Sequence, residues 1–526
     1  MESDPIHLKH PAPTFREWRP VAALQALFFI TALIGLNGPL DSMHYLRQCQ
    51  TFDVARHVFR DGWSAVFTPR ASFTEFSVPD DTFSPLVLPA PRFTIIHLEV
   101  PFHGLFAWPA ALLFPGQELV IVRLVSVVFA LLSISLVYLV LRHWLDAAPA
   151  LGGTALWTTA PLFIHCGQVP MPDVLAITGL LLAFLLALRG SIGGSSSAFL
   201  FTILAKLSLI VYGLPVLAAL LIARECRSIG QFVKISLLWG LGPLLGITGW
   251  LSLSRHDPYG SWVVFGGFAP GPYGPPGLAD WLDPKFNLNP LLYVFVFGGG
   301  IMGIVGLLFA LGKTAARLNP VLKGSIILAL LANYGLEKVV WFEPQYALPV
   351  IFWLVLAASF GFSRLLEIVR ENRSWRIPLA CLLVLHLALV CVTTNFLRSS
   401  RVPNVRDVEA AAQLTPPDAR VVVYAKLPAG IPSAWMDRNT LKVAPFETYS
   451  DSGMDKLNQR LQGFRQAGFN YLIVFDVQGP HRGNPLRATD YDGDLTSASS
   501  PFRRYFDQKY QKLFEANNVV LYSLGP

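Results

Sequence analysis

Four polar side chains follow one another at helical spacing near residue 45. Asp41, His44, Gln48 and Thr51 stand three or four positions apart, so a helix from Asp41 to Thr51 would place them along one face. An acid, an imidazole, an amide and a hydroxyl on one face can bind a substrate and move a proton. We therefore interpret the first long loop, residues 39–118, as the site of catalysis.

The elements that must hold this loop are membrane helices. The chain has 526 residues, of which 53% are hydrophobic and only 14% are charged, against about 25% charged in soluble proteins. A span of the bilayer needs about 20 apolar residues. We predict an α-helical polytopic membrane protein with about eleven transmembrane helices, at 20–38, 119–141, 149–165, 173–188, 195–206, 208–223, 231–253, 289–312, 321–336, 346–363 and 377–394. The pair flanking Lys206 is short, and one kinked helix could replace it.

The apolar stretch at 102–114 is only about half the length of a span, and we predict a juxtamembrane helix there, inside the first loop. With the N-terminus in the cytoplasm, alternate loops carry most of the Lys and Arg residues, at 142, 189, 224–234, 313–323 and 364–376. The opposite short loops are nearly free of them. The positive-inside rule therefore places the first loop and the C-terminal tail outside the cytoplasm.

The composition changes near residue 398. The tail carries RVVVYA at 420–425, a helical pattern at 454–469, NYLIVFD at 470–476 and NVVLYSL at 518–524. These predict strand, helix, strand and strand, a small soluble α/β domain. The predicted domains are thus a cytoplasmic segment 1–19, a transmembrane domain 20–397 and an external domain 398–526.

Two other classes of function receive no support. The net charge of +7 comes mainly from short loops and the tail, without a basic stripe, so nucleic acid is not an expected partner. Five widely separated cysteines, Cys49, Cys166, Cys226, Cys381 and Cys391, form no C-x-x-C pair and predict neither a zinc site nor a disulfide framework.

The order of these features resembles the GT-C membrane glycosyltransferases, above all the bacterial relatives of protein mannosyltransferases and the lipid A aminoarabinose transferase. Asp41 to Thr51 lies where members read D-x-x-H-S-W-R-Q-T-x-T. E-x-P occurs at Glu99 to Pro101, a P-D turn at Asp173, and EPQYALP begins at Glu343. The resemblance covers roughly residues 20–360.

The chain departs from this pattern in three places. Leu46 stands where relatives often have Trp, and Gln168 where Arg is common. The acidic pair that opens the loop in the aminoarabinose transferase type is absent, which weakens a metal site at this motif. No cofactor is required by the pattern, and a divalent cation, Mg²⁺ or Mn²⁺, stays an open alternative.

The resemblance implies an inverting transferase in a bacterial inner membrane. It would move a sugar from a polyprenyl-phosphate carrier to a lipid, glycan or protein acceptor on the external face, with membrane lipids as further partners. Asp41 would be the catalytic base, although it could instead only cap a helix that starts at Ser42, and Asp53 is the rival acid. His44 and Gln48 would orient the acceptor or the base, or serve as hydrogen-bonded structural residues.

The leaving phosphate needs a cation. Lys206 lies in the run AFLFTILAKLSLIVYGLP, and a lysine at membrane depth usually marks a site, so we predict a phosphate ligand there. The alternative is a lysine that extends to the interface. Arg47 and Lys338 are further phosphate candidates, with contact to solvent or lipid headgroups as their alternative.

The remaining candidates would hold substrate. Asp173 follows Pro172 at the start of a span, where it could instead be a helix N-cap. Glu99 would position the acceptor or a metal. Glu343, Gln345 and Tyr346 would line the sugar pocket, although such residues also form interface belts.

Two other functions remain open on the sequence. A transporter or flippase for a lipid-linked saccharide would line a pathway with buried charges, but we find no inverted repeat and the charges lie on one side rather than at the midplane. A catalytically inactive relative that serves in assembly is the second alternative, because the first loop departs from the family pattern.

Overall fold

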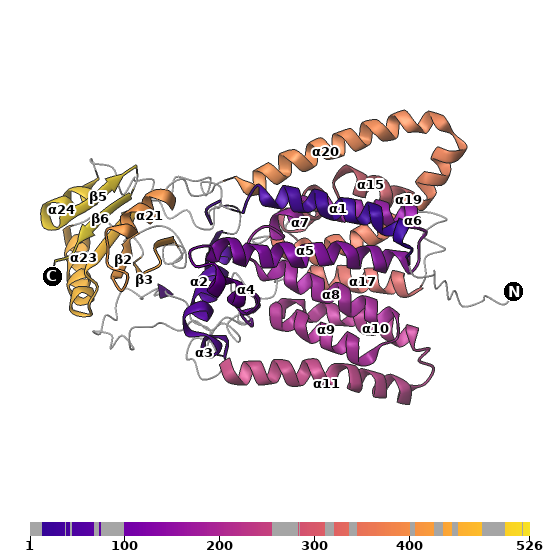
Figure 1. Cartoon of the computed structure of the whole chain (residues 1–526), viewed down its shortest axis with the longest axis horizontal. Helices are drawn as coiled ribbons and strands as arrows, with labels where there is room; N and C mark the ends of the chain where they lie inside the picture. Colours follow the sequence, from indigo (N-terminus) through magenta and orange to yellow (C-terminus); the bar gives the residue numbers. More distant parts are fainter. Residues whose placement is uncertain are drawn as a thin grey trace. The chain divides into compact units, whose positions relative to one another are not determined.

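The protein is described here from a computed structural model (Figure 1). The described residues are 13–36, 38–40, 42, 45–67, 73–74, 99–254, 282, 284–310, 320–335, 344–399, 405–424, 435–443, 451–475, 500–517 and 519–525. They divide into two compact units. The helical unit comprises Met1–Asn37, His97–Phe106 and Leu119–Arg398, and the loop–tail unit comprises Gly38–Ile96, Ala107–Glu118 and Ser399–Pro526.

The helical unit is a bundle in which α8, α9 and α11 pack in order and α19 packs against α6 and α15. Its elements are α1 (Phe15–Leu33), the first turn of α4 (Phe102–Leu113), α5 (Glu118–Arg142), α6 (Ala147–Thr158), α7 (Pro161–Cys166), α8 (Pro172–Leu188), α9 (Ile192–Ala205), η1 (Leu207–Tyr212), α10 (Gly213–Ala223), α11 (Ile229–Ser254), α14 (Pro284–Val294), η2 (Phe295–Gly299), α15 (Gly300–Ala310), α17 (Pro320–Gly335), η3 (Pro344–Ala347), α19 (Leu348–Glu371), η4 (Arg373–Trp375) and α20 (Arg376–Arg398).

Among the described residues, five stretches are long and apolar enough to cross a membrane: Glu118–Arg142, Ile229–Ser252, Leu291–Ala310, Gln345–Glu371 and Arg373–Arg398. Shorter apolar helices are Phe102–Leu113, Pro172–Leu188, Ile192–Ala205 and Leu207–Ala223. Each predicted span overlaps a helix, so the helical membrane fold is confirmed, while the number of spans stays a prediction. The stretch at 102–114 is a helix of 12 residues, as predicted.

Two predicted spans have the wrong bounds. The first helix runs from Phe15 to Leu33 rather than 20–38, and it continues through Pro20, which lies inside it. The predicted span 149–165 is two helices, because Pro161 begins α7 at its first position and Ala160 before it is extended, as a residue preceding proline prefers.

Close helix approach depends on small residues in α15 and α19. A Cβ on Gly361 would lie 1.8 Å from the Gly306 carbonyl oxygen, closer than two atoms can approach. Only glycine therefore allows these two backbones to touch.

The loop–tail unit contains a six-stranded sheet in the order β1-β3-β2-β4-β6-β5. The strands are β1 (Phe73–Thr74), β2 (Arg420–Tyr424), β3 (Asn439–Val443), β4 (Tyr471–Phe475), β5 (Gln511–Ala516) and β6 (Val519–Ser523), and the helices are α2 (Tyr45–Asp61), α3 (Trp63–Phe67), the rest of α4, α21 (Val405–Gln413), α23 (Asp451–Gln466) and α24 (Pro501–Lys509). The first four strands in this order pair in parallel, and β6 is antiparallel to both neighbours.

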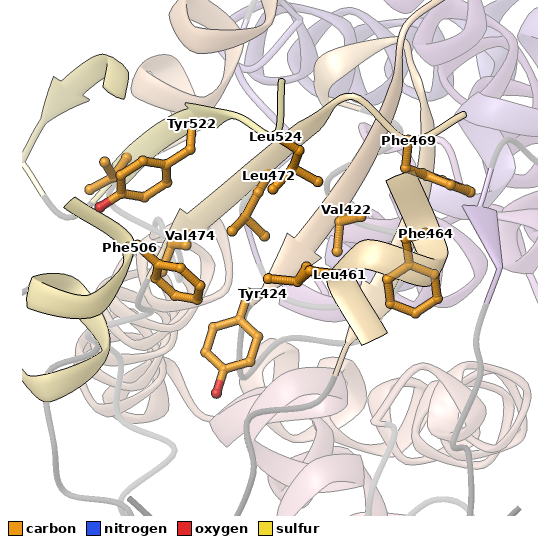
Figure 2. Close-up of a cluster of buried hydrophobic side chains, with 11 residues drawn as sticks. Val422, Tyr424, Leu461, Phe464, Phe469, Leu472, Val474, Phe506, Tyr522 and Leu524 are labelled. Atoms are coloured by element: carbon orange, nitrogen blue, oxygen red, sulfur yellow. The ribbon is translucent and has the colours of Figure 1, made fainter. Parts of the chain in front are cut away.

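The core of this unit lies between the sheet and two helices (Figure 2). Tyr424, Leu472 and Tyr522 come from three neighbouring strands, and Leu461 of α23 and Phe506 of α24 pack against them. Residues 421–424 of β2 are all buried, and α21 packs against the same sheet at β6. The unbroken apolar run VVVY at 421–424 is typical of strands covered on both faces.

The predicted strands at 420–425, 470–476 and 518–524 are confirmed as β2, β4 and β6, and the predicted helix as α23. β3, β5, α24 and the short β1 of the first loop were not predicted. The domain bounds 1–19, 20–397 and 398–526 stay predictions, as does the external position of the tail.

Candidate active site

Lys206 occupies a break between two helices. α9 ends at Ala205, Lys206 itself has extended backbone angles, φ −155° and ψ 102°, and η1 begins at Leu207. The residue is 6% exposed. The break turns the charged side chain into the helical unit, so Lys206 is not a lysine that extends to a polar surface.

Asp173 is the ion-pair partner of this lysine. It lies in the first turn of α8, and its Oδ1 receives a hydrogen bond from Lys206 Nζ. The side chains are 3% and 7% exposed, respectively. The N-cap of α8 is Met171, so the N-cap alternative for Asp173 is wrong. Its negative charge still suits the positive end of the helix dipole.

Tyr346 completes the cluster from a third segment. In η3 its ring centroid lies 3.8 Å from Lys206 Nζ, which is a cation–π contact. Gln345 beside it is 2% exposed. Two of the predicted site residues, Asp173 and Tyr346, therefore meet at the ammonium group of a third, Lys206, although the three come from segments far apart in the sequence.

The E-x-P segment joins α9 next to this cluster. Val100 N donates to the Leu204 carbonyl oxygen at 2.8 Å, two residues before Lys206. Phe102, the first residue of α4, packs on Phe201 of α9 with ring centroids 4.7 Å apart. Glu99 is half-buried, and this backbone bond fixes its segment at the end of α9 that carries Lys206.

The cluster offers both signs of charge in an apolar setting. Within the described part of the chain, Asp173 Oδ2 is buried and has no hydrogen-bond partner. A buried acceptor of this kind normally has a partner, so a hydroxyl group of a bound molecule could donate to it. Lys206 supplies a point charge of the kind that binds phosphate oxygens.

Comparison with known proteins identifies the fold that carries this cluster. Residues 99–250 match the family model described as dolichyl-phosphate-mannose-protein mannosyltransferase. The structure is similar to that of ArnT from Cupriavidus metallidurans bound to undecaprenyl phosphate, with a TM-score of 0.60 and 13% identity over 97% of this chain and 98% of that one. This is a GT-C fold. The resemblance stated from the sequence is confirmed.

Two further solved structures share the GT-C fold. ArnT in the apo state has a TM-score of 0.57 at 15% identity, covering 95% of this chain and 98% of that one. The apo oligosaccharyltransferase of Archaeoglobus fulgidus has a TM-score of 0.54 at 10% identity, covering 88% and 70%. No curated protein matches the chain in sequence. These identities are low, so the structural similarity establishes the fold alone.

Two predicted site residues lie in α2 of the loop–tail unit. Gln48 is fully buried, and its Nε2 donates to Ser42 Oγ at 3.0 Å. Arg47 is half-buried, and its carbonyl oxygen accepts from Thr51 Oγ1 at 2.9 Å. The Thr51 hydroxyl therefore bonds to the backbone of its own helix. Asp53, the rival acid, is 1% exposed.

Four predicted site residues, Asp41, His44, Lys338 and Glu343, lie outside the described residues. Their roles stay predictions. Among the residues that are described, no three His, Cys, Asp or Glu side chains are grouped to hold a metal ion.

Sequence reasoning missed Arg398, at the end of α20. Its Nε donates to Gln168 Oε1 at 2.9 Å, and its Nη2 donates to the Thr31 carbonyl oxygen at 2.9 Å. A guanidinium group thus lies at Gln168, where relatives often carry Arg in the sequence. The available signal was an arginine that directly follows the last apolar run.

Proposed function

We propose that this protein is a glycosyltransferase that takes a sugar from a polyprenyl-phosphate donor. The observation that carries the proposal is the Lys206–Asp173 ion pair under the Tyr346 ring, inside a GT-C fold. The similar ArnT structure that holds undecaprenyl phosphate supports a carrier of this class.

The ion pair is difficult to explain by stability. A buried pair pays a desolvation cost that often exceeds its attraction, and apolar residues of similar size frequently serve as well. An ammonium group among apolar helices is costly in a membrane protein and usually marks a site for a charged ligand. Lys206 is therefore assigned to the leaving phosphate, and Asp173 and Tyr346 hold the lysine in place.

The reaction that we propose for this protein is an inverting transfer. The bond between the anomeric carbon and the phosphate oxygen breaks, and its electron pair leaves with the phosphate, whose charge Lys206 stabilises. The acceptor hydroxyl oxygen attacks from the opposite face and forms the new glycosidic bond. A carboxylate of the first loop, Asp41 or Asp53, takes the hydroxyl proton.

The same proposal includes the side of the membrane. The distribution of Lys and Arg favours a cytoplasmic N-terminus and an external loop–tail unit, in the inner membrane of a bacterium. The acceptor is a hydroxyl group on a lipid, a glycan or a protein.

Sugar transfer in vesicles tests this proposal. Radiolabelled sugars on a panel of polyprenyl phosphates are supplied to the wild type and to Lys206→Met and Asp41→Asn variants. We expect Lys206→Met to lower transfer by about 100-fold or more, as loss of a charge that stabilises the leaving group should. Lys234→Met, at an exposed position of α11, is the matched control and should transfer normally.

The outcomes separate the alternatives. Loss of transfer in Asp41→Asn with unchanged protein level supports the base at this position. Full transfer in Lys206→Met refutes the phosphate role of Lys206. Movement of intact donor across the membrane without transfer to any acceptor would instead favour the transporter.

A further inference from the structure

The first loop and the C-terminal tail form one structural unit. β1, which follows α2 in the loop, pairs in parallel with β3 of the tail, with Phe73 opposite Thr440. Before α2, the Leu40 carbonyl oxygen accepts from Trp435 Nε1 at 3.4 Å. The tail therefore binds the loop on both sides of α2.

A third contact reaches α2 itself. Both carboxylate oxygens of Asp437 accept from Arg60 Nη2, at 2.7 and 2.6 Å, and Oδ1 also lies 3.2 Å from Arg56 Nη1. Arg56 and Arg60 are four positions apart, so they share one face of the helix. Two like charges on one face repel each other, and the carboxylate between them offsets this repulsion by attracting both.

Asp437 lies in a segment that is anchored to the rest of the tail. It has a positive φ of 53°, a conformation that Asp and Asn adopt more readily than most residues. The next residue, Arg438, donates from Nη2 to the carbonyl oxygens of Ala412 and Thr415 at 3.1 and 2.9 Å. Trp435 before it is 6% exposed. The contacts of its two neighbours, Trp435 and Arg438, thus fix the backbone of Asp437 within the tail.

The helix that it holds carries predicted site residues. The Arg56 guanidinium lies 4.4 Å from the Phe52 ring centroid, and this ring is 4% exposed. On the same helix Gln48 and Asp53 are 0% and 1% exposed. A rotation of α2 would move these buried polar groups together with the two arginines.

We propose that Asp437 is a positioning residue, through which the C-terminal α/β domain fixes the orientation of the first-loop helix for sugar transfer. The inference rests on the proposed function for its effect on activity, but the contact between tail and helix stands on its own. Side-chain exposures are 37% for Asp437 and 51% for Arg60, and pairs this exposed add little to global stability. The expected consequence is a change in geometry rather than unfolding.

The test uses the full-length protein with the Asp437→Asn substitution. Asn keeps the size and tolerates the positive φ, so mainly the charge is lost. Glu515→Gln is the matched control, since Glu515 pairs with Arg503 and Lys512 at 2.7 Å each in the same unit, away from α2.

Two measurements are made on each variant. Amide hydrogen exchange over residues 45–61 should become about five- to tenfold faster in Asp437→Asn, with unchanged exchange in β2 and β4 and an unchanged unfolding midpoint. The kcat of sugar transfer should fall about five- to tenfold with the KM for donor unchanged. Arg60→Gln should give the same changes, and the double variant should be no worse than either, because the two residues act as one unit.

The outcomes are distinct from those of the proposed function. If the wild type transfers no sugar, the proposed function fails, and the exchange of α2 still decides whether the clamp exists. Unchanged exchange of α2 in Asp437→Asn, or equal acceleration in Glu515→Gln, overturns the proposal. Faster exchange with an unchanged kcat overturns the role of Asp437 in transfer.

Discussion

The ion pair between Lys206 and Asp173 predicts a particular pattern of stability. Each side chain is at most 7% exposed, so removal of one partner leaves a buried charge without its counter-ion. Such a change costs about 3–5 kcal/mol. The Tyr346 ring at 3.8 Å retains about 1 kcal/mol of the interaction with Lys206. We therefore expect Asp173→Leu to lower the free energy of unfolding by about 3 kcal/mol.

The reverse substitution completes a double-mutant cycle. Lys206→Met leaves the Asp173 carboxylate buried and should cost about 3–5 kcal/mol. The double variant Asp173→Leu/Lys206→Met replaces the whole pair by apolar groups of similar size, and should be within about 1 kcal/mol of the wild type or more stable. The two single effects should thus be strongly non-additive.

The assay is reversible unfolding in mixed micelles followed by tryptophan fluorescence, with sugar transfer measured on the same samples. A double variant that regains stability and remains inactive would show that the pair is kept for the site. Single substitutions that each change the unfolding free energy by less than about 1 kcal/mol would refute the reasoning, since loss of one partner of a buried pair should change it by more than this. Recovery of transfer in the double variant would refute the role of Lys206 in binding phosphate.

Three further predictions follow from other contacts. Arg123 is 2% exposed and donates to two carbonyl oxygens just after α1, at 3.0 and 2.7 Å. Arg123→Met should lower the unfolding free energy by about 3 kcal/mol because these acceptors lose their donor. An unchanged unfolding free energy would contradict this. Gly361→Ala should lower the unfolding free energy by about 3 kcal/mol, because its Cβ would lie 1.8 Å from the Gly306 carbonyl oxygen. The control is Gly249→Ala, whose Cβ meets no described atom within 4 Å. This variant should be as stable as the wild type or slightly more stable. Burial acts to raise the pKa of Asp437, but the neighbouring arginines outweigh it and hold this pKa below its usual 3.8. The local stability that this carboxylate adds to α2 is therefore complete above the unfolded pKa and lost as the pH falls through the folded pKa. The ratio of the α2 amide exchange rates of Asp437→Asn and wild type should thus be constant at pH 5–7 and approach one below about pH 3.8, while a ratio that persists at low pH would oppose it.

Lys206 shows what could be predicted at the site. A single lysine in an apolar run can be recognised in the sequence as a site residue, because removing its charge from water costs free energy whichever residue pairs with it. Its partners were each named as site residues, yet their meeting was not predicted. Asp173 lies 33 positions earlier, and only the packing of α8 against α9 brings the two side chains together.

The loop–tail unit shows where sequence reasoning stopped. β2, β4 and β6 are apolar strands with clear boundaries, so local pattern was sufficient to predict them. β1 is two residues long and exists only because β3 offers it a parallel edge. Asp437 likewise carries no local signal, since its partners Arg56 and Arg60 are more than 370 positions away.

The sequence by itself determined that this is a polytopic helical protein with the GT-C order of motifs, because hydrophobic run length and charge placement act locally along the chain. Only the tertiary structure decided which charges meet. Ion pairs, cation–π contacts and strand pairing act over a few ångströms, and chain segments far apart in sequence reach that range only after the helices and the sheet have packed.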